Sequence, residues 1–150
     1  MTTFAYSKAD NIIAIDGRVT AGSRIVSDVD KKYIKKGKNV YFTIGGLADA
    51  MRLIDLVEAG LEEIGDDNVY ECQLVLAAIP PVEIYVNEAG YIESVPIIED
   101  LYTLGSGGDH ALTALDLGRT PKQAVQHAMT RDICSGGKII QYDLTKGKFK

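Results

Sequence analysis

The sequence predicts an α+β fold in which antiparallel sheets are covered by helices. Short apolar runs are joined in hairpin fashion, one amphipathic helix follows the first group of strands, and two more helices precede the last strand. This order lacks the strand–helix–strand alternation that builds parallel sheets. At 150 residues and 46% hydrophobic content, with no Pro/Gly/Ser-rich linker, the chain is expected to form a single domain over residues 1–150.

The first half of the chain reads as strands followed by a helix. Apolar runs at 3–7 and 11–16 flank the turn residue Asp10 and predict an opening hairpin, and further strands are expected at 19–26 and 39–44. The basic run at 31–38 is typical of a solvated turn between strands. After Gly45-Gly46, apolar residues recur every three or four positions with acidic residues opposite, which predicts a helix of about four turns that residues 65–68 stop. The apolar positions are Leu47, Met51, Ile54, Leu56, Val57 and Leu61.

The second half returns to strands and then to helices. The run at 73–79 predicts a buried strand that Pro80-Pro81 ends, and a hairpin is expected to join 82–86 to 91–95. A strand at 101–104 leads through a glycine-rich turn into a helix over 109–117. Thr120 and Pro121 are a typical N-cap and first helical residue, so 121–130 should be helical. Residues 139–144 form the last predicted strand.

Charge and composition exclude several function classes. The formal net charge is −5 with acidic residues spread along the chain, which argues against a nucleic-acid partner. Neither an apolar run of membrane-spanning length nor a signal-peptide pattern is present, so no membrane partner and a cytoplasmic location are expected. Cys72 and Cys134 lack CxxC spacing and should be free thiols, and His110 and His127 stand apart from any metal-ligand motif.

Six short blocks share an order and approximate spacing with a known family. They are Thr2-Thr3, residues 13–20, Asp30-Lys31-Lys32, residues 44–50, residues 104–108 and residues 131–137. Over nearly its whole length the chain resembles the proteasome β-subunit and HslV-like family, which are N-terminal-nucleophile hydrolases of the threonine peptidase type. The resemblance implies a four-layer αββα sandwich of two antiparallel sheets. The second helix of the family is expected to be missing, since only a short loop fits between Ile64 and Glu71.

By this resemblance, Thr2 is the nucleophile once Met1 is removed. Its own α-amino group would act as the base, which is chemically reasonable because such a group has an ordinary pKa of about 7.7–8.0 and lies beside the hydroxyl. Asp16 and Lys32 match the family's acidic and lysine partners of the nucleophile. A buried ammonium there favours the alkoxide, and the carboxylate keeps the lysine charged and in place.

The remaining site residues follow from the same resemblance. Ser106 matches the serine of the family's GSG turn, and Asp132 with Ser135 match its late Asp-x-x-Ser, the groups that hold the terminal amine. Phe42 falls where the family has the glycine whose backbone N–H forms the oxyanion hole. No cofactor is implied, although relatives hold a structural monovalent or divalent cation on backbone carbonyls that correspond to Met129, Asp132 and Ser135.

The function predicted from these matches is a threonine-type endopeptidase subunit that acts on unfolded polypeptides inside a self-associating ring. The missing helix puts docking of an ATPase unfoldase in doubt. Two alternatives remain open. One is a catalytically inactive assembly subunit, which Phe42 in the oxyanion position would favour, and the other is an amidohydrolase of the same class that acts on small amides.

Overall fold

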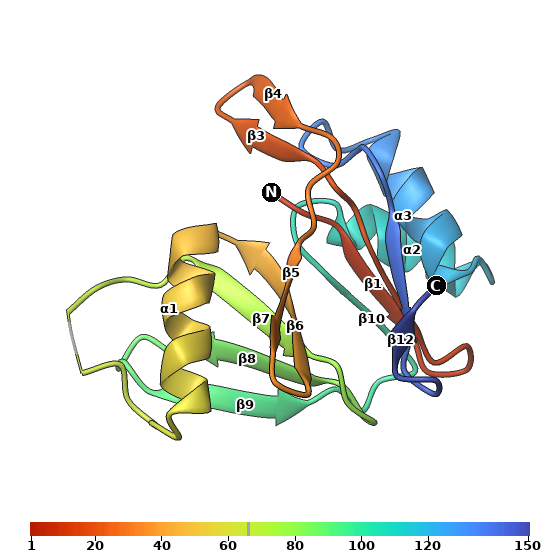
Figure 1. The fold of residues 1–150 in the computed structure, drawn as a ribbon. Helices are drawn as coiled ribbons and strands as arrows, with labels where there is room; N and C mark the ends of the chain where they lie inside the picture. Colours follow the sequence, from red (N-terminus) through yellow and green to blue (C-terminus); the bar gives the residue numbers. More distant parts are fainter. Residues whose placement is uncertain (66) are drawn as a thin grey trace. The chain divides into compact units, whose positions relative to one another are not determined.

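The structure, a computed structural model, describes residues 1–65 and 67–150. The chain divides into two compact units, Met1–Lys32 with Glu99–Lys150 (unit 1) and Tyr33–Ile98 (unit 2). Each unit holds one five-stranded antiparallel sheet, and three helices accompany the sheets in the described residues (Figure 1). The predicted α+β class is therefore confirmed, whereas the single-domain assignment stays a prediction. Of the predicted helix stop at 65–68, residue 66 lies outside the described residues.

Unit 1 is built on a sheet with strand order β10-β1-β2-β11-β12. Its first hairpin pairs Phe4 with Ile15, and the opposite edge of β1 pairs Phe4 with Leu104. The central position of β1 and β2 explains why all their residues are buried. The strands are β1 (Phe4–Ser7), β2 (Ile12–Ile15), β10 (Leu101–Leu104), β11 (Ile140–Asp143) and β12 (Lys148–Phe149), and a separate hairpin contains β3 (Val19–Ala21) and β4 (Arg24–Ser27).

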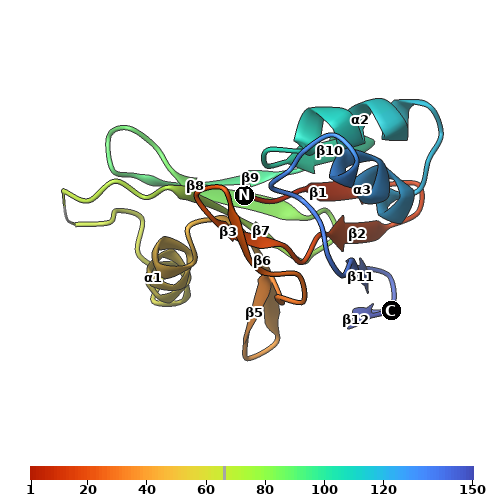
Figure 2. The same cartoon turned by 90° about the horizontal axis from the view of Figure 1, so that it is seen from above.

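Two helices, α2 (Gly108–Asp116) and α3 (Pro121–Met129), lie on one face of this sheet, as Figure 2 shows. Helix α3 packs on β1 and β2, and α2 packs on β10 and β1. The Thr120 hydroxyl accepts from the N–H of Gln123 and the Gln123 side chain accepts from the N–H of Thr120, which is a complete capping box. Small side chains allow the helices to approach the sheet closely. The buried alanines of this layer are Ala5, Ala14, Ala111, Ala114, Ala124 and Ala128.

Unit 2 has strand order β5-β6-β7-β8-β9, and α1 (Leu47–Glu58) covers β6 and β7 (Figure 1). Leu53 and Ile54 of α1 are fully buried against the sheet, where they contact a cluster that includes Leu74 and Ile84. No helix occurs among the described residues between α1 and β7, so the predicted absence of a second helix is confirmed. The strands are β5 (Tyr33–Lys36), β6 (Asn39–Gly45), β7 (Cys72–Leu76), β8 (Val82–Val86) and β9 (Ile92–Pro96).

Local structure differs from the prediction at several elements. The expected strand at 19–26 is two strands, because Gly22-Ser23 forms a tight turn between β3 and β4. The basic run contains the edge strand β5, whose lysines do not prevent pairing with β6 because an edge strand tolerates charge. Helix α1 ends at Glu58, earlier than expected, since Gly60 takes a positive φ of 75°. In the described part of the chain, no helix is long and apolar enough to cross a bilayer.

Candidate active site

Thr2 and Thr3, directly before β1, are buried inside unit 1. Thr2 is only 3% exposed, whereas Met1 before it is 61% exposed. The backbone of Thr2 packs directly against Gly105. Gly105 has a φ of 90°, and a Cβ added to it would collide with the carbonyl of Thr2. The glycine in the turn after β10 therefore allows the close approach that holds Thr2 in place.

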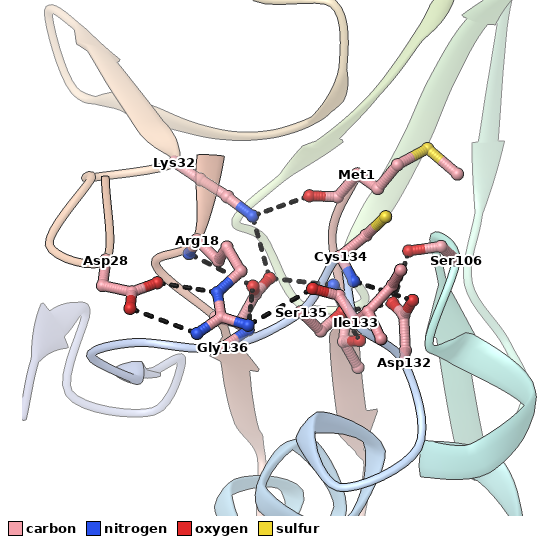
Figure 3. Close-up of polar contacts among 12 residues, drawn as sticks. Met1, Arg18, Asp28, Lys32, Ser106, Asp132, Ile133, Cys134, Ser135 and Gly136 are labelled. Carbon is pink, nitrogen blue, oxygen red and sulfur yellow. Dashed lines mark hydrogen bonds and ion pairs between the residues drawn. The ribbon is translucent and has the colours of Figure 1, made fainter. Parts of the chain in front are cut away.

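Asp16, directly after β2, is the centre of a buried polar network that includes Lys32, Arg18 and Gly136, which Figure 3 labels. One carboxylate oxygen accepts from the backbone N–H of Thr3 and from Lys32 Nζ, both at 2.9 Å. The other accepts from the N–H of Gly136 at 3.0 Å and of Arg18 at 3.2 Å. Asp16 is fully buried, and four donors compensate the loss of water around its charge.

Lys32 connects this network to the first residue of the chain. Its ammonium donates to Asp16 and, at 3.0 Å, to the carbonyl oxygen of Met1. Burial lowers the pKa of Lys32 below its ordinary value, while Asp16 acts in the opposite direction. The Met1 carbonyl belongs to the peptide bond whose cleavage would free the amine of Thr2. The structure thus places a positive charge directly beside the atoms that would become the chain's new N-terminus.

Asp132 forms a second acidic centre with Ser106 and Ser135. The hydroxyls of both serines donate to the same carboxylate oxygen at 2.6 Å, and the N–H of Cys134 donates to the other oxygen at 3.1 Å. Burial acts to raise the pKa of Asp132, but these hydrogen bonds together bring it below its ordinary value. Because the Ser135 hydroxyl donates to Asp132, it accepts from Thr3 Oγ1 at 2.6 Å. A chain of hydroxyl groups therefore connects the N-terminal segment to a charged carboxylate.

The structure places five of the predicted groups within unit 1 at the N-terminal segment. Asp16 and Ser135 contact Thr3, and Lys32 contacts the Met1 carbonyl. Asp132 joins Ser106 to Ser135. Their catalytic roles stay predictions.

An ion pair that the sequence reasoning did not assign supports the same loop. Arg18 donates to both carboxylate oxygens of Asp28 at 2.7 and 3.1 Å and to the carbonyl of Ile133 at 3.2 Å. Its hydrogen bond lowers the pKa of Asp28. A Cβ on Gly136 would collide with the Arg18 guanidinium, so the close packing of this loop on Arg18 requires glycine at position 136. In the sequence, the position of Arg18 only two residues after Asp16 was the one indication that it lies near the site.

A surface cavity of about 440 Å³ opens beside Asp132 within unit 1. It lies between the β3–β4 hairpin and the loop that follows α3, so its walls come from segments more than a hundred residues apart. Apolar, basic and acidic side chains all reach it. The side chains that line it include Arg18, Thr20, Ile25, Met129, Arg131 and Ile133.

Two further predictions concern the oxyanion hole and the cation. Phe42 lies in β6 of unit 2, where it is fully buried and its ring lies 6.4 Å from that of Tyr33 between centroids. Its backbone role stays a prediction. Of the carbonyls expected to hold a cation, that of Asp132 accepts from the N–H of Ser135 in a tight turn. No group of three or more His, Cys, Asp or Glu side chains in the described residues could hold a metal. That search concerns side chains, so the cation on the backbone carbonyls of Met129, Asp132 and Ser135 stays a prediction.

Comparisons with known proteins give a fold but no close relative. No protein-family model matches the chain, and no curated protein matches it. Among solved structures, eukaryotic HslV from Trypanosoma brucei is similar with a TM-score of 0.69 and 18% sequence identity, over 93% of this chain and 97% of that one. The chain therefore has the fold of an HslV-like proteasome β subunit, as the sequence blocks predicted.

Proposed function

We propose that this chain, on its HslV-like fold, is a threonine-type endopeptidase subunit whose nucleophile is Thr2 after removal of Met1. The observation that carries the proposal is the contact of Lys32 with both Asp16 and the Met1 carbonyl. The Lys32 ammonium is buried, and it is held between a buried carboxylate and the N-terminal peptide bond. It serves a nucleophile that forms at that end of the chain.

The proposed first step is acylation of Thr2. The free α-amine takes the proton of Oγ as Oγ bonds to the substrate carbonyl carbon, and Lys32 stabilises the negative charge that develops at Oγ. The C–N bond then breaks, and the amine's proton passes to the leaving peptide. Water hydrolyses the resulting ester, with the same amine as base, and returns Thr2 to its starting form. Asp132, with Ser106 and Ser135, holds the α-ammonium that exists between these transfers.

Intact-mass measurement with an electrophilic threonine inhibitor tests the proposal directly. Purified protein should lack the mass of Met1, and the inhibitor should add one equivalent that peptide mapping assigns to Thr2. Thr2→Ala should abolish the addition, and Lys32→Met should slow it by at least ~100-fold because a catalytic electrostatic group typically contributes 10²–10³. The matched control is Lys31→Met, which removes an exposed lysine next to Lys32. Retention of Met1 together with absent labelling would refute the mechanism.

A catalytically inactive assembly subunit is the second candidate, favoured by the fully buried Phe42 in a position that relatives give to glycine. A benzyl group there restricts the backbone shapes that an oxyanion hole needs. An amidohydrolase of small amides is the third. An assay with an unfolded casein-like protein and with small amides separates these candidates. The peptidase should cleave the protein, the amidohydrolase should cleave the small amides, and the assembly subunit should cleave neither substrate.

In the leading proposal the subunits self-associate in a ring and cleave unfolded polypeptide, while docking of an ATPase unfoldase stays in doubt without the second helix. A cytoplasmic location is part of the same proposal.

A further inference from the structure

The two units carry opposite formal charges. Residues 33–98 contain eleven Asp and Glu against four Lys and Arg, a formal charge of −7. The rest of the chain contains twelve Lys and Arg against ten Asp and Glu, a formal charge of +2. Contact between unlike units of two copies is therefore electrostatically favoured over contact between like units.

Unit 2 has an uncovered apolar groove where α1 ends. This groove, about 480 Å³ in volume, lies between the end of α1 and the start of strand β9. Leu61 and Tyr91 at the groove are 50% and 49% exposed. The carboxylates of Glu62 and Glu93 line it as well, and neither takes part in an ion pair among the described residues. We call this the acidic groove.

Unit 1 presents a complementary projection at the turn between α2 and α3. Leu117 is 78% exposed there, and the exposed Arg119 and Lys122 flank it without an ion-pair partner in the described residues. A hollow of about 410 Å³ lies beside Leu117, with Arg119 and His127 among the side chains that line it. We call this the basic corner.

Backbone hydrogen bonds keep the basic corner rigid. The N–H of Leu117 donates to Thr113 and Ala114, the N–H of Arg119 donates to Ala114, and the capping box at Thr120 holds the start of α3. Leu117 therefore cannot turn inward to bury itself without breaking the end of α2. A large exposed leucine on a rigid turn is suited to a preformed contact, since little conformational entropy is lost on binding.

We propose that the basic corner of one copy docks in the acidic groove of a second copy, so that the chain associates head to tail. Leu117 fills the groove beside Leu61, the exposed Tyr91 ring enters the hollow beside Leu117, and Arg119 and Lys122 face Glu62 and Glu93. Burial of the leucine and the tyrosine supplies most of the affinity, and the charges set the orientation.

The contact is heterologous, because pairing groove with groove would bring carboxylates against carboxylates. A heterologous contact closes into a ring or continues as a helical filament. The inference rests on the self-association in the proposed function and adds the surfaces that make it.

Sedimentation velocity of the full chain over a range of concentrations tests this contact. The sedimentation coefficient of the wild-type chain should rise with concentration as assemblies larger than a monomer form, and added salt should weaken this association. Glu62→Lys with Glu93→Lys should weaken association at least tenfold, and so should Arg119→Glu with Lys122→Glu. An equimolar mixture of these two double variants should recover association, because each supplies the charges that the other's remaining surface now requires.

Two controls separate this contact from general charge effects. Asp10→Lys with Glu99→Lys changes the net charge as much as the groove variant does, but on exposed residues of unit 1, and should not weaken association. Asp116→Lys adds a positive charge to the basic corner and should strengthen association. Circular dichroism checks that each variant is folded.

Three results would overturn the proposal: a monomeric wild-type chain at every concentration, unchanged association in the groove variant, or no recovery in the mixture. The readout does not involve catalysis, and Thr2→Ala should assemble like the wild-type chain. Loss of inhibitor labelling with intact assembly would therefore refute the proposed chemistry alone, and the reverse result would refute the docking alone.

Discussion

Replacing Asp16 with asparagine is expected to cause a large loss of stability. The carboxylate is fully buried and accepts four hydrogen bonds, one of them from the buried ammonium of Lys32. In Asp16→Asn the single amide oxygen can serve two of these donors, whereas the new NH₂ group faces the other two. The variant also leaves the Lys32 charge without its counter-ion. Removing one partner of a buried ion pair costs about 3–5 kcal/mol.

Urea unfolding followed by circular dichroism measures this loss. With a slope of about 2 kcal/mol/M, typical of a small protein, the midpoint should fall by about 2 M. Asp28→Asn is the matched control, because Asp28 also pairs with a cation but its side chain is 43% exposed. Exposed pairs contribute about 0–1 kcal/mol, so the control should lose far less.

A second variant separates the cost of the unpaired charge from the lost backbone contacts. Adding Lys32→Met to Asp16→Asn removes the ammonium that the first substitution left unpaired, so the double variant should be more stable than the sum of the two single losses predicts. A loss below about 1 kcal/mol in Asp16→Asn, or one equal to that of Asp28→Asn, would refute the view that this network holds the N-terminal segment.

Three further outcomes are expected. Gly105→Ala should destabilise the chain by about 1–3 kcal/mol in urea unfolding, because φ is 90° and the new methyl group meets the Thr2 carbonyl; Gly118→Ala, with a φ of 85° but open space, should cost less. Leu53→Ala should cost about 2–5 kcal/mol by the same measurement, whereas alanine at the exposed Met51 should cost little. Since the pKa of Asp132 is lowered in the folded chain, its ionisation stabilises the chain above the ordinary carboxyl value of 3.8 and ceases to do so as pH falls through the folded pKa. The stability difference between the wild-type chain and Asp132→Asn should accordingly shrink in that acid range, and a difference that stays constant with pH would contradict the role of the serine hydrogen bonds.

Local sequence patterns determined most elements of this fold. The apolar spacing that begins at Leu47 and the Thr120-Pro121 cap predicted α1 and α3, because helical periodicity and capping act within a few residues. The same reasoning failed at 19–26 and at the basic run. At 19–26 the pattern of apolar residues is compatible with one strand or with two. In the basic run, the lysines of an edge strand cannot be told from those of a turn by sequence alone.

The candidate site was determined by the sequence only as a set of residues. The resemblance named Thr2, Asp16, Lys32 and Asp132, but their contacts join segments that lie far apart in the chain: Asp16 accepts from Gly136 over 120 positions, and Thr3 meets Ser135 over 132. Distances of this kind depend on the register of β1 between β2 and β10 and on the turn at Gly105. Only the tertiary structure could decide them, because no short-range pattern in a sequence records which distant backbone N–H will face a buried carboxylate.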